Sequence, residues 1–245
     1  MKLLILFAIF CLEHNSNSLS LPSTFQRCDK RKSNFNDCLS SAIQNAVSQL
    51  SKPIKEYGLP SFEPFLIPAV TLNPGSTVSM DQNFTNYRIT GRTNITSTKA
   101  IMNFDDLTLT IRMVHPEIRY LVDYQVKGSM FLLPIDASGL VTAKGYNILY
   151  TSIFNFEEYT KSGRRYLRVV SGKITMEPES MTFYFENLFD DKELNDAYSR
   201  AVTKRSKEIF GLLQYAYGDS YARAYSDVFN NFLSKVPLTE LFEGV

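Results

Sequence analysis

The 245-residue chain contains no tryptophan, only two histidines and three cysteines, and its formal net charge is +1. So few histidines leave little material for a metal centre or for histidine-based catalysis. Proteins that bind nucleic acids usually carry a basic excess, which this chain lacks. The sequence also has no G-x-S-x-G, H-E-x-x-H, Walker A or G-x-G-x-x-G motif. We therefore expect no enzyme activity, no catalytic residues, no metal, no cofactor and no nucleic-acid partner.

The N-terminus has the pattern of a secretory signal peptide. Lys2 precedes an apolar run over residues 3–12, and small polar residues follow at 16–20. The run is shorter than the roughly 20 apolar residues of a membrane-spanning helix. An anchor that stays attached is the alternative. We predict that residues 1–18 are a signal peptide, cleaved after Ser18 or Ser20, and that residues 19–245 form a secreted, extracellular domain.

Cleavage would remove Cys11 and leave Cys28 and Cys38. Two cysteines in an oxidising compartment most simply form a disulfide. The alternative is a metal pair, but it has no nearby histidine and zinc would need four ligands. Asn83 and Asn94 each begin an N-x-T triplet in a polar stretch, which predicts two glycosylation sites.

Periodicity divides the rest of the chain into a helix, strands and a helical tail. Apolar residues recur at helical spacing over 37–50, where Asn36 can cap the helix start. From about 78 to 185 apolar and polar residues alternate, which is typical of antiparallel strands with one wet face. Residues 136–139 and 161–163 are predicted hairpin turns. We expect His115 at a strand edge or on the surface.

The tail from about residue 191 to 236 has helical spacing, and Asp190 with Glu193 resembles a capping box. Unbroken, this helix would be about 70 Å long, whereas a compact globule of this size has a radius of gyration of only about 17 Å. Either the helix breaks near Gly218 or the molecule is elongated. Long strands favour the second interpretation, with a curved sheet wrapped around the helix.

Several short motifs occur in a characteristic order. They are the Cys28 and Cys38 pair, G-L-P at 58–60 with Pro64, Y-Q-V-K-G at 124–128 followed by L-L-P-I at 132–135, E-N-L-F-D at 186–190 with Leu194-Asn195, and F-L-S-K-V-P at 232–237. Together they resemble the insect takeout and haemolymph juvenile-hormone-binding protein family, a one-domain relative of the bactericidal/permeability-increasing lipid-binding fold. One departure is residues 136–139, Asp-Ala-Ser-Gly, where the family usually has a Gly-x-Gly-like turn.

The resemblance implies an elongated single α+β domain. In it a long C-terminal helix is wrapped by a curved antiparallel sheet, with a short disulfide-tethered N-terminal helix. It also implies a secreted, monomeric carrier with an internal apolar tunnel for a terpenoid, juvenile-hormone-like compound, fatty acid or related lipid. Candidate lining residues are Phe62, Phe65, Tyr120, Tyr124, Val126, Phe210, Leu213 and Tyr217. Ordinary core packing is the alternative for each, because inward-facing apolar residues look the same in a filled core.

A second functional class is a protein of the same fold that acts on membranes or microbial lipids. The basic residues Lys30, Arg31 and Lys32 could help it find anionic surfaces, although a net charge of +1 gives little long-range steering. A carrier could also make transient membrane or receptor contacts. A lipid esterase would need a nucleophile and a base that the sequence does not reveal.

Overall fold

The structure is a computed structural model that describes residues 18–72, 80–130 and 133–245. The predicted signal peptide falls, except for Ser18, outside the described residues. The elements in chain order are β1 (Cys28–Asp29), α1 (Phe35–Ser48), the 3₁₀ turn η1 (Lys55–Tyr57), β2 (Phe65–Leu72), β3 (Met80–Thr90), β4 (Ser97–Asn103), β5 (Thr108–Met130), β6 (Leu133–Lys161), β7 (Arg164–Glu177), β8 (Ser180–Phe185), α2 (Lys192–Lys204), α3 (Ser206–Leu233), α4 (Leu238–Leu241) and β9 (Phe242–Glu243).

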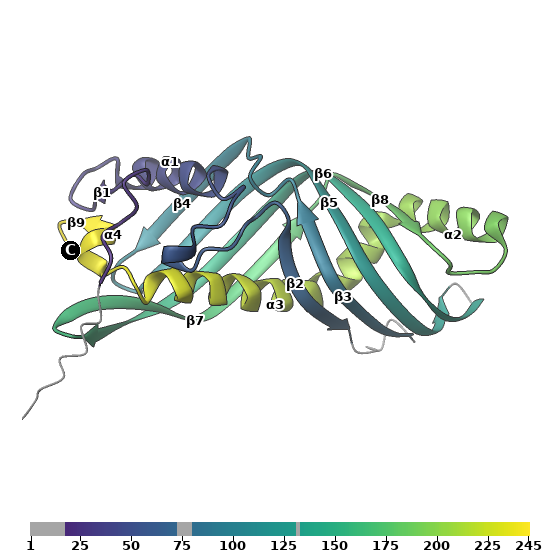
Figure 1. Ribbon diagram of the computed structural model, residues 1–245. Helices are drawn as coiled ribbons and strands as arrows, with labels where there is room; N and C mark the ends of the chain where they lie inside the picture. The colour runs from purple at the N-terminus through teal and green to yellow at the C-terminus, as the bar shows by residue number, and fades with distance from the viewer. Residues whose placement is uncertain (1–17, 73–79, 131–132) are drawn as a thin grey trace, which may run out of the picture.

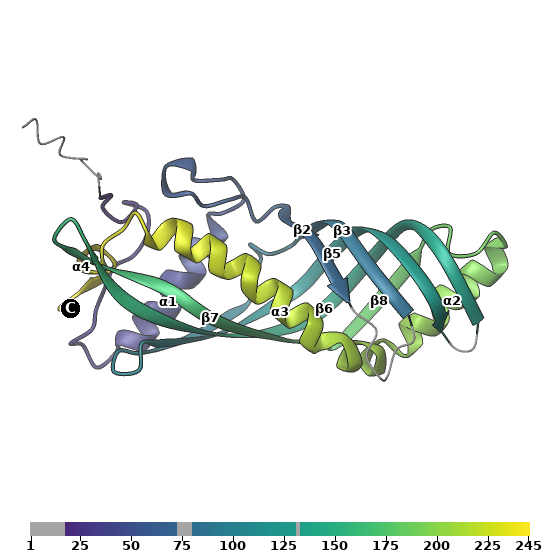
Figure 2. The same ribbon diagram turned by 90° about the horizontal axis from the view of Figure 1, so that it is seen from below.

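Two very long strands, β5 and β6, form the axis of an antiparallel seven-stranded sheet. The whole of β5 pairs with residues 133–155 of β6, and each strand has a different outer neighbour in each half. β5 pairs with β4 in its first half and with β3 in its second, while β6 pairs with β8 and then β7. Irregularities in the β3–β5 and β6–β7 registers add local bends. The result is an elongated, curled sheet, with α3 lying along its hollow side (Figures 1 and 2).

Alternation along β5 explains which face is covered. Ile118, Val122 and Val126 are buried, whereas Arg119 and Gln125 are exposed. This is the pattern of a strand with one face on the core and one in water. The chain is therefore α+β, with its core between the sheet and α3.

The predicted turn at residues 136–139 is wrong, because these residues lie inside β6. Ala137 pairs with Val126, and Ser138 pairs with Gln125. The register of the β5–β6 pair runs on to Met130 opposite Leu133. Turn-forming side chains are local preferences of a few tenths of a kcal/mol to about 1 kcal/mol, and the long ladder overrides them.

The expectation for His115 is also wrong. Its side chain is fully buried in the middle of β5. The next residue, Pro116, lies where β5 has finished pairing with β4 at Val114 and has not yet begun to pair with β3 at Arg119. A proline without an N–H group is tolerated in a sheet where no ladder bond is required.

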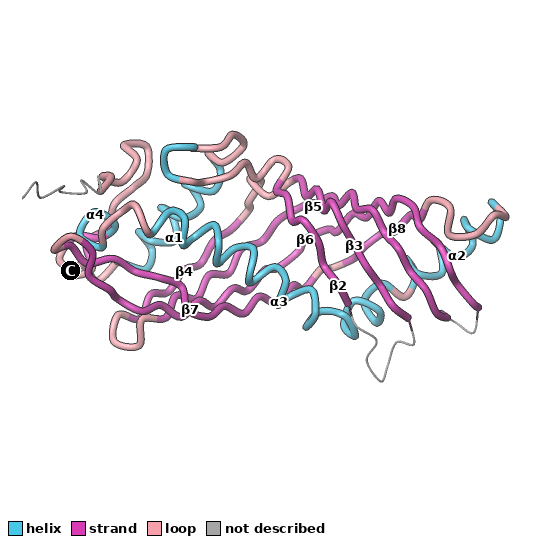
Figure 3. Tube along the Cα trace, turned by 60° about the horizontal axis from the view of Figure 1, so that its bottom comes forward, coloured by secondary structure: helices cyan, strands magenta, loops and turns pink. Residues whose placement is uncertain are grey.

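The helical tail consists of α2 and α3, which meet at Arg205 rather than near Gly218. The N-cap of α2 is Asp191, not Asp190, and its side chain accepts a hydrogen bond from the Leu194 backbone N–H at 2.9 Å. Gly218 lies inside the 28-residue α3, close to the Ile174 carbonyl oxygen of β7. Figure 3 shows α3 running along the sheet as one continuous helix. Among the described residues, no helix is long and apolar enough to cross a membrane.

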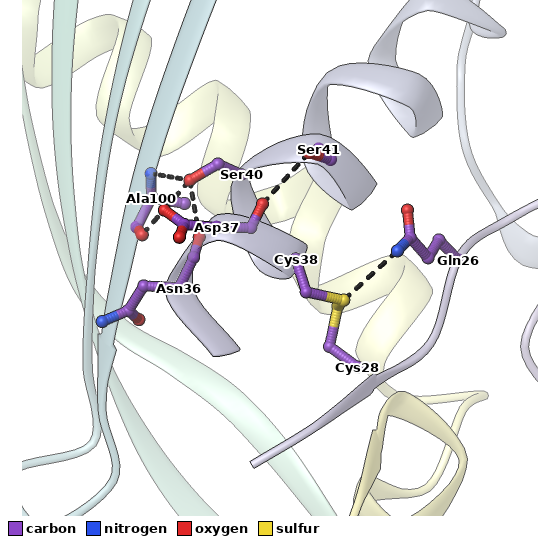
Figure 4. Close-up of a disulfide and its surroundings, with 8 residues drawn as sticks. All are labelled: Gln26, Cys28, Asn36, Asp37, Cys38, Ser40, Ser41 and Ala100. Atoms are coloured by element: carbon purple, nitrogen blue, oxygen red, sulfur yellow. Dashed lines mark hydrogen bonds between the residues drawn. A yellow bond between two sulfur atoms is a disulfide. The ribbon is translucent and has the colours of Figure 1, made fainter. Parts of the chain in front are cut away.

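Helix α1 covers the edge of β4 at one end of the molecule (Figure 1). It begins two residues earlier than predicted. Asn36 does not cap it, because the N-cap position is Asn34 and Asn36 lies inside the helix. The Asn36 side-chain oxygen instead accepts a hydrogen bond from the Met102 N–H of β4 at 3.3 Å. Ser40 binds the same strand, accepting a hydrogen bond from the Ala100 N–H at 2.8 Å. The predicted disulfide between Cys28 and Cys38 is present and ties α1 to β1 (Figure 4).

Candidate functional site: two apolar cavities separated by tyrosines

The interior between the sheet and the helices contains two apolar cavities. The first, of about 230 Å³, lies under α1 and the C-terminal half of α3. The second, of about 110 Å³, lies under α2 and the N-terminal half of α3. Each is lined mainly by aliphatic and aromatic side chains from the sheet and from a helix. Such concave, largely apolar sites with a few polar groups are typical of small-molecule binding.

Helix α1 forms one wall of the first cavity because its apolar face points inward. Leu39, Ala42, Ile43 and Val47 all line the cavity from this helix. Helix α3 contributes the opposite wall through residues that include Tyr225 and Phe229. The disulfide and the hydrogen bonds to β4 hold α1 in this position (Figure 4).

Tyrosines from the sheet and from α3 separate the two cavities. The hydroxyl of Tyr120, which lines the second cavity, lies 2.7 Å from the hydroxyl of Tyr150, which lines the first. On α3, Tyr221 borders the second cavity and Tyr225, one turn later, borders the first. Burial raises the pKa of Tyr225 to about 12, so its hydroxyl is neutral at physiological pH.

A buried arginine lies beside this partition. Arg92 has only 6% of its surface exposed and lines the first cavity. Its guanidinium carbon lies 4.2 Å from the ring centre of Tyr150 and 5.2 Å from that of Tyr225. Cation–π contacts of this kind hold a guanidinium in place. The guanidinium is always protonated, so the apolar cavity contains a positive charge.

The loop between β3 and β4 brings Arg92 to this place. Both carboxylate oxygens of Glu63 accept hydrogen bonds from this loop, from the backbone N–H groups of Gly91 at 2.7 Å and of Thr93 at 2.8 Å. Gly91 has φ +92°, and a Cβ there would lie 2.3 Å from the Glu117 carbonyl oxygen. Glycine is therefore required where the loop crosses β5, at the gap between its two neighbours.

His115 occupies the same gap and also lines the first cavity. Its Nδ1 lies 3.1 Å from the Asn94 carbonyl oxygen, and its ring meets the Tyr150 ring edge-on at 5.3 Å. Burial, with the nearby Arg92 charge, lowers the pKa of His115 to about 3. The imidazole is therefore neutral, and a neutral ring with this contact donates from Nδ1 to the Asn94 carbonyl.

The eight residues predicted to line a tunnel are distributed over both cavities and the packed core. Phe62 lines the first cavity, and four line the second: Tyr120, Val126, Phe210 and Tyr217. Phe65 and Tyr124 pack in the core instead: Phe65 stacks on Tyr225 at 4.9 Å, and Tyr124 donates a hydrogen bond to the Glu186 carbonyl at 2.6 Å. The side chain of Leu213 lies outside the described residues.

Arg92 and Glu63 are not among the functional residues predicted from the sequence. Arg92 stands in a polar stretch beside the Asn94 triplet, a context that indicates a surface loop. The local signal available was Gly91 directly after a strand, which marks a tight backbone approach. No group of three or more His, Cys, Asp or Glu residues in the described ranges is placed to hold a metal ion.

The remaining predicted sites lie on the surface. Asn83, on β3, and Asn94, in the loop before β4, are both exposed. In the basic segment, Arg31 forms an ion pair with Asp29 at 2.8 Å, and the Lys30 ammonium lies 5.0 Å from the Phe104 ring centre. Two of the three basic side chains thus have a partner within the protein.

Comparisons with known proteins agree with this architecture. The fold is that of takeout proteins. The crystal structure of Takeout 1 from Epiphyas postvittana superimposes with a TM-score of 0.78 at 17% identity, covering 89% of this chain and 99% of that one. The model of the haemolymph juvenile hormone binding protein (JHBP) family matches residues 4–243. The chain therefore belongs to this family.

Two curated relatives extend along almost the whole chain. The circadian clock-controlled protein daywake of Drosophila melanogaster is 24% identical over 237 residues, covering 92% of this chain and 90% of that protein. The daywake protein of Drosophila yakuba is 22% identical over 237 residues, covering 93% of this chain and 90% of that protein.

Proposed function

We propose that this protein is a secreted, monomeric, non-enzymatic carrier that binds a small hydrophobic ligand between its sheet and its helices. The observation that carries the proposal is the first cavity, an apolar space of about 230 Å³ closed by α1 and α3. An engineered apolar cavity of about 150 Å³ stays dry and binds benzene, so a space of this size and polarity suits an apolar guest.

Family membership supports the same function. The family is described by the binding of a hormone in haemolymph. The α1 wall makes the interior apolar, and the tyrosine partition between the cavities, formed by Tyr120, Tyr150, Tyr221 and Tyr225, adds a few hydroxyl groups. This is the pattern of a ligand site. A terpenoid, a juvenile-hormone-like compound or a fatty acid would meet these requirements.

The test is to purify the secreted protein, extract it with organic solvent and identify the extract by mass spectrometry. We expect a reproducible hydrophobic compound and uptake of the neutral fluorophore N-phenyl-1-naphthylamine. Ala46→Phe, which fills the cavity from α1, should lower uptake at least about tenfold. Asn45→Phe, on the exposed side of the same helix, is the matched control and should keep it. A protein that carries no lipid and takes up no fluorophore would disprove the carrier function.

A further inference from the structure

We propose that the ligand of the first cavity is an acid, and that Arg92 binds its carboxylate. This inference rests on the proposed carrier function and narrows its ligand class. A chain or branched hydrocarbon would fill the apolar part of the cavity, and the carboxylate would lie at the tyrosine partition. Neutral esters and alcohols of the same size would bind more weakly.

Within the described part of the chain, the Arg92 side chain is buried with two of its nitrogen donors unpartnered. Its Nε and Nη1 atoms are buried and make no hydrogen bond to any described residue. Nor does the guanidinium form an ion pair in the described part of the chain. The ring faces of Tyr150 and Tyr225 stabilise its charge but do not replace good acceptors for its N–H groups. Buried charges in proteins are normally paired, so this one lacks a counter-ion.

The nearby carboxylate of Glu63 does not fill this role. One of its oxygens accepts from the Gly91 N–H, and the other accepts from both the N–H and the hydroxyl of Thr93, at 2.8 and 3.0 Å. Its lone pairs hold the loop on both sides of Arg92. Glu63 thus positions the arginine and leaves its Nε and Nη1 donors without a partner.

Other polar groups converge on the cavity with Arg92. The Tyr225 hydroxyl is also buried, lies near the Arg92 guanidinium and belongs to a residue that lines the same cavity. A carboxylate has two oxygens that accept about four hydrogen bonds and pairs with guanidinium in a two-pronged geometry. Because His115 is neutral, Arg92 carries the only charge among the described residues that line the cavity. One carboxylate balances that charge.

The size of the cavity sets the expected length of the acid. Benzene places six carbon atoms in a cavity of about 150 Å³, so by proportion about 230 Å³ holds roughly nine. Roughly nine hydrocarbon carbons and the carboxyl carbon together make an acid of about ten carbons. Decanoic acid is a straight-chain probe of this size, and geranic acid is a branched, unsaturated acid with the same carbon number. The two acids distinguish a fatty-acid source of the carboxylate from a terpenoid source.

The experiment measures displacement of N-phenyl-1-naphthylamine by decanoic acid, geranic acid, methyl decanoate and decanol at pH 7.5. We expect at least one acid to bind about tenfold more tightly than the neutral compounds. In Arg92→Met this preference should vanish: the ratio of acid to methyl decanoate affinity, measured within that variant, should fall to about one. Arg119→Met, which removes an exposed arginine from β5, is the matched control and should keep the preference.

The possible outcomes test the role of Arg92 and the carrier function separately. Equal affinity for acid and ester in the wild type, or an acid preference that survives Arg92→Met, would overturn the role of Arg92 while leaving a carrier. Failure of every compound and of the fluorophore would reject the carrier function and this inference with it.

Two further measurements guard against a misfolded variant. Removal of an unpaired buried charge should raise the melting temperature of the ligand-free protein. Arg92→Gln, which keeps a polar side chain, provides a second neutral variant with the same expected loss of preference. Decanoic acid labelled with ¹³C at the carboxyl gives a direct signal. In the wild type the ¹³C chemical shift of the bound acid should be that of an ionised carboxylate. In Arg92→Met the signal should no longer appear at that chemical shift.

Discussion

Arg92 and His115 both contact the ring of Tyr150, which is a residue of β6. The guanidinium carbon lies 4.2 Å from the ring centre, and the imidazole meets the ring edge-on at 5.3 Å. A positive charge on His115 would be repelled by the charge on Arg92, and burial would keep water away from it. This explains why His115 stays neutral while Arg92, which cannot release its proton, keeps its charge.

The low pKa of His115 makes stability depend on pH. An unfolded histidine titrates near 6.5, whereas burial and the Arg92 charge lower the pKa of His115 to about 3 in the folded protein. Below pH 6.5 the unfolded chain therefore binds a proton that the folded protein does not, and the free energy of unfolding falls. Between pH 7 and pH 5 this group should remove about 2 kcal/mol, at about 1.4 kcal/mol per pH unit.

Urea unfolding at pH 7, 6 and 5 checks this prediction by comparing the wild type with His115→Gln. The wild type should lose about 2 kcal/mol more than the variant over this range. Carboxylates titrate equally in both proteins, so their effect cancels in the difference. Parallel pH profiles for the two proteins would show that His115 titrates with an ordinary pKa.

At the scale of the elements, the packing of α3 against β7 depends on a close approach of the two backbones. A Cβ at Gly218 would lie 2.3 Å from the Ile174 carbonyl oxygen of β7, whereas a Cβ at Gly211 would meet no atom within 4 Å. Both glycines lie within the same helix. Gly218 is required by packing, whereas Gly211 only adds flexibility to the unfolded chain.

These two glycines form a matched pair of substitutions. Gly211→Ala should raise the free energy of unfolding by about 0.5–1 kcal/mol, because alanine loses less backbone entropy in a helix. Gly218→Ala should lower it by about 1–3 kcal/mol, because the methyl group forces α3 away from β7. Thermal and urea denaturation measure both. Equal stabilisation by the two alanines would show that the approach of α3 to β7 is looser than in the structure.

The disulfide is expected to hold α1 against the first cavity. Helix α1 has 14 residues, and isolated helices of this length are marginal in water. Its docking therefore depends on its apolar face, its hydrogen bonds to β4 and the Cys28–Cys38 bond. Replacing both cysteines with serine should speed the release of N-phenyl-1-naphthylamine severalfold, while the sheet stays folded.

Stopped-flow release rates, measured beside far-ultraviolet circular dichroism, test this role of α1. The loss of global stability should be at or below the low end of the usual 2–5 kcal/mol, because the closed loop is short and the core is large. Mass spectrometry must first show that the parent protein contains the bond. An unchanged release rate would mean that the bond does not hold α1 over the cavity.

At the scale of the whole molecule, the two long strands determine the shape. β6 has 29 residues, and at about 3.3 Å per residue its path is roughly 95 Å. Helix α3 then lies along the sheet instead of packing across it, as Figure 2 shows. The interior formed in this way is long and narrow. The two cavities therefore lie one after the other along the length of the molecule.

Small-angle X-ray scattering of the mature chain should give a radius of gyration clearly above the 17 Å or so of a compact protein of this length. The forward scattering should correspond to one chain, since we propose a monomer. A radius near 17 Å would contradict the elongated shape. A doubled mass would instead contradict the monomer.

The sequence by itself determined the α+β class, the helix near residues 37–50, the alternating strands and the pairing of Cys28 with Cys38. These features follow from local periodicity and from counting cysteines, which need no knowledge of distant contacts. The tertiary structure alone decided that residues 136–139 extend a strand, because β5 supplies the pairing partners. It also decided that Arg92 and His115 face one cavity. Their side chains meet only because the β3–β4 loop crosses β5 where the strand changes neighbours. A polar residue in a loop has the same local sequence signal whether it faces water or a buried ligand, so only the fold could place this charge inside.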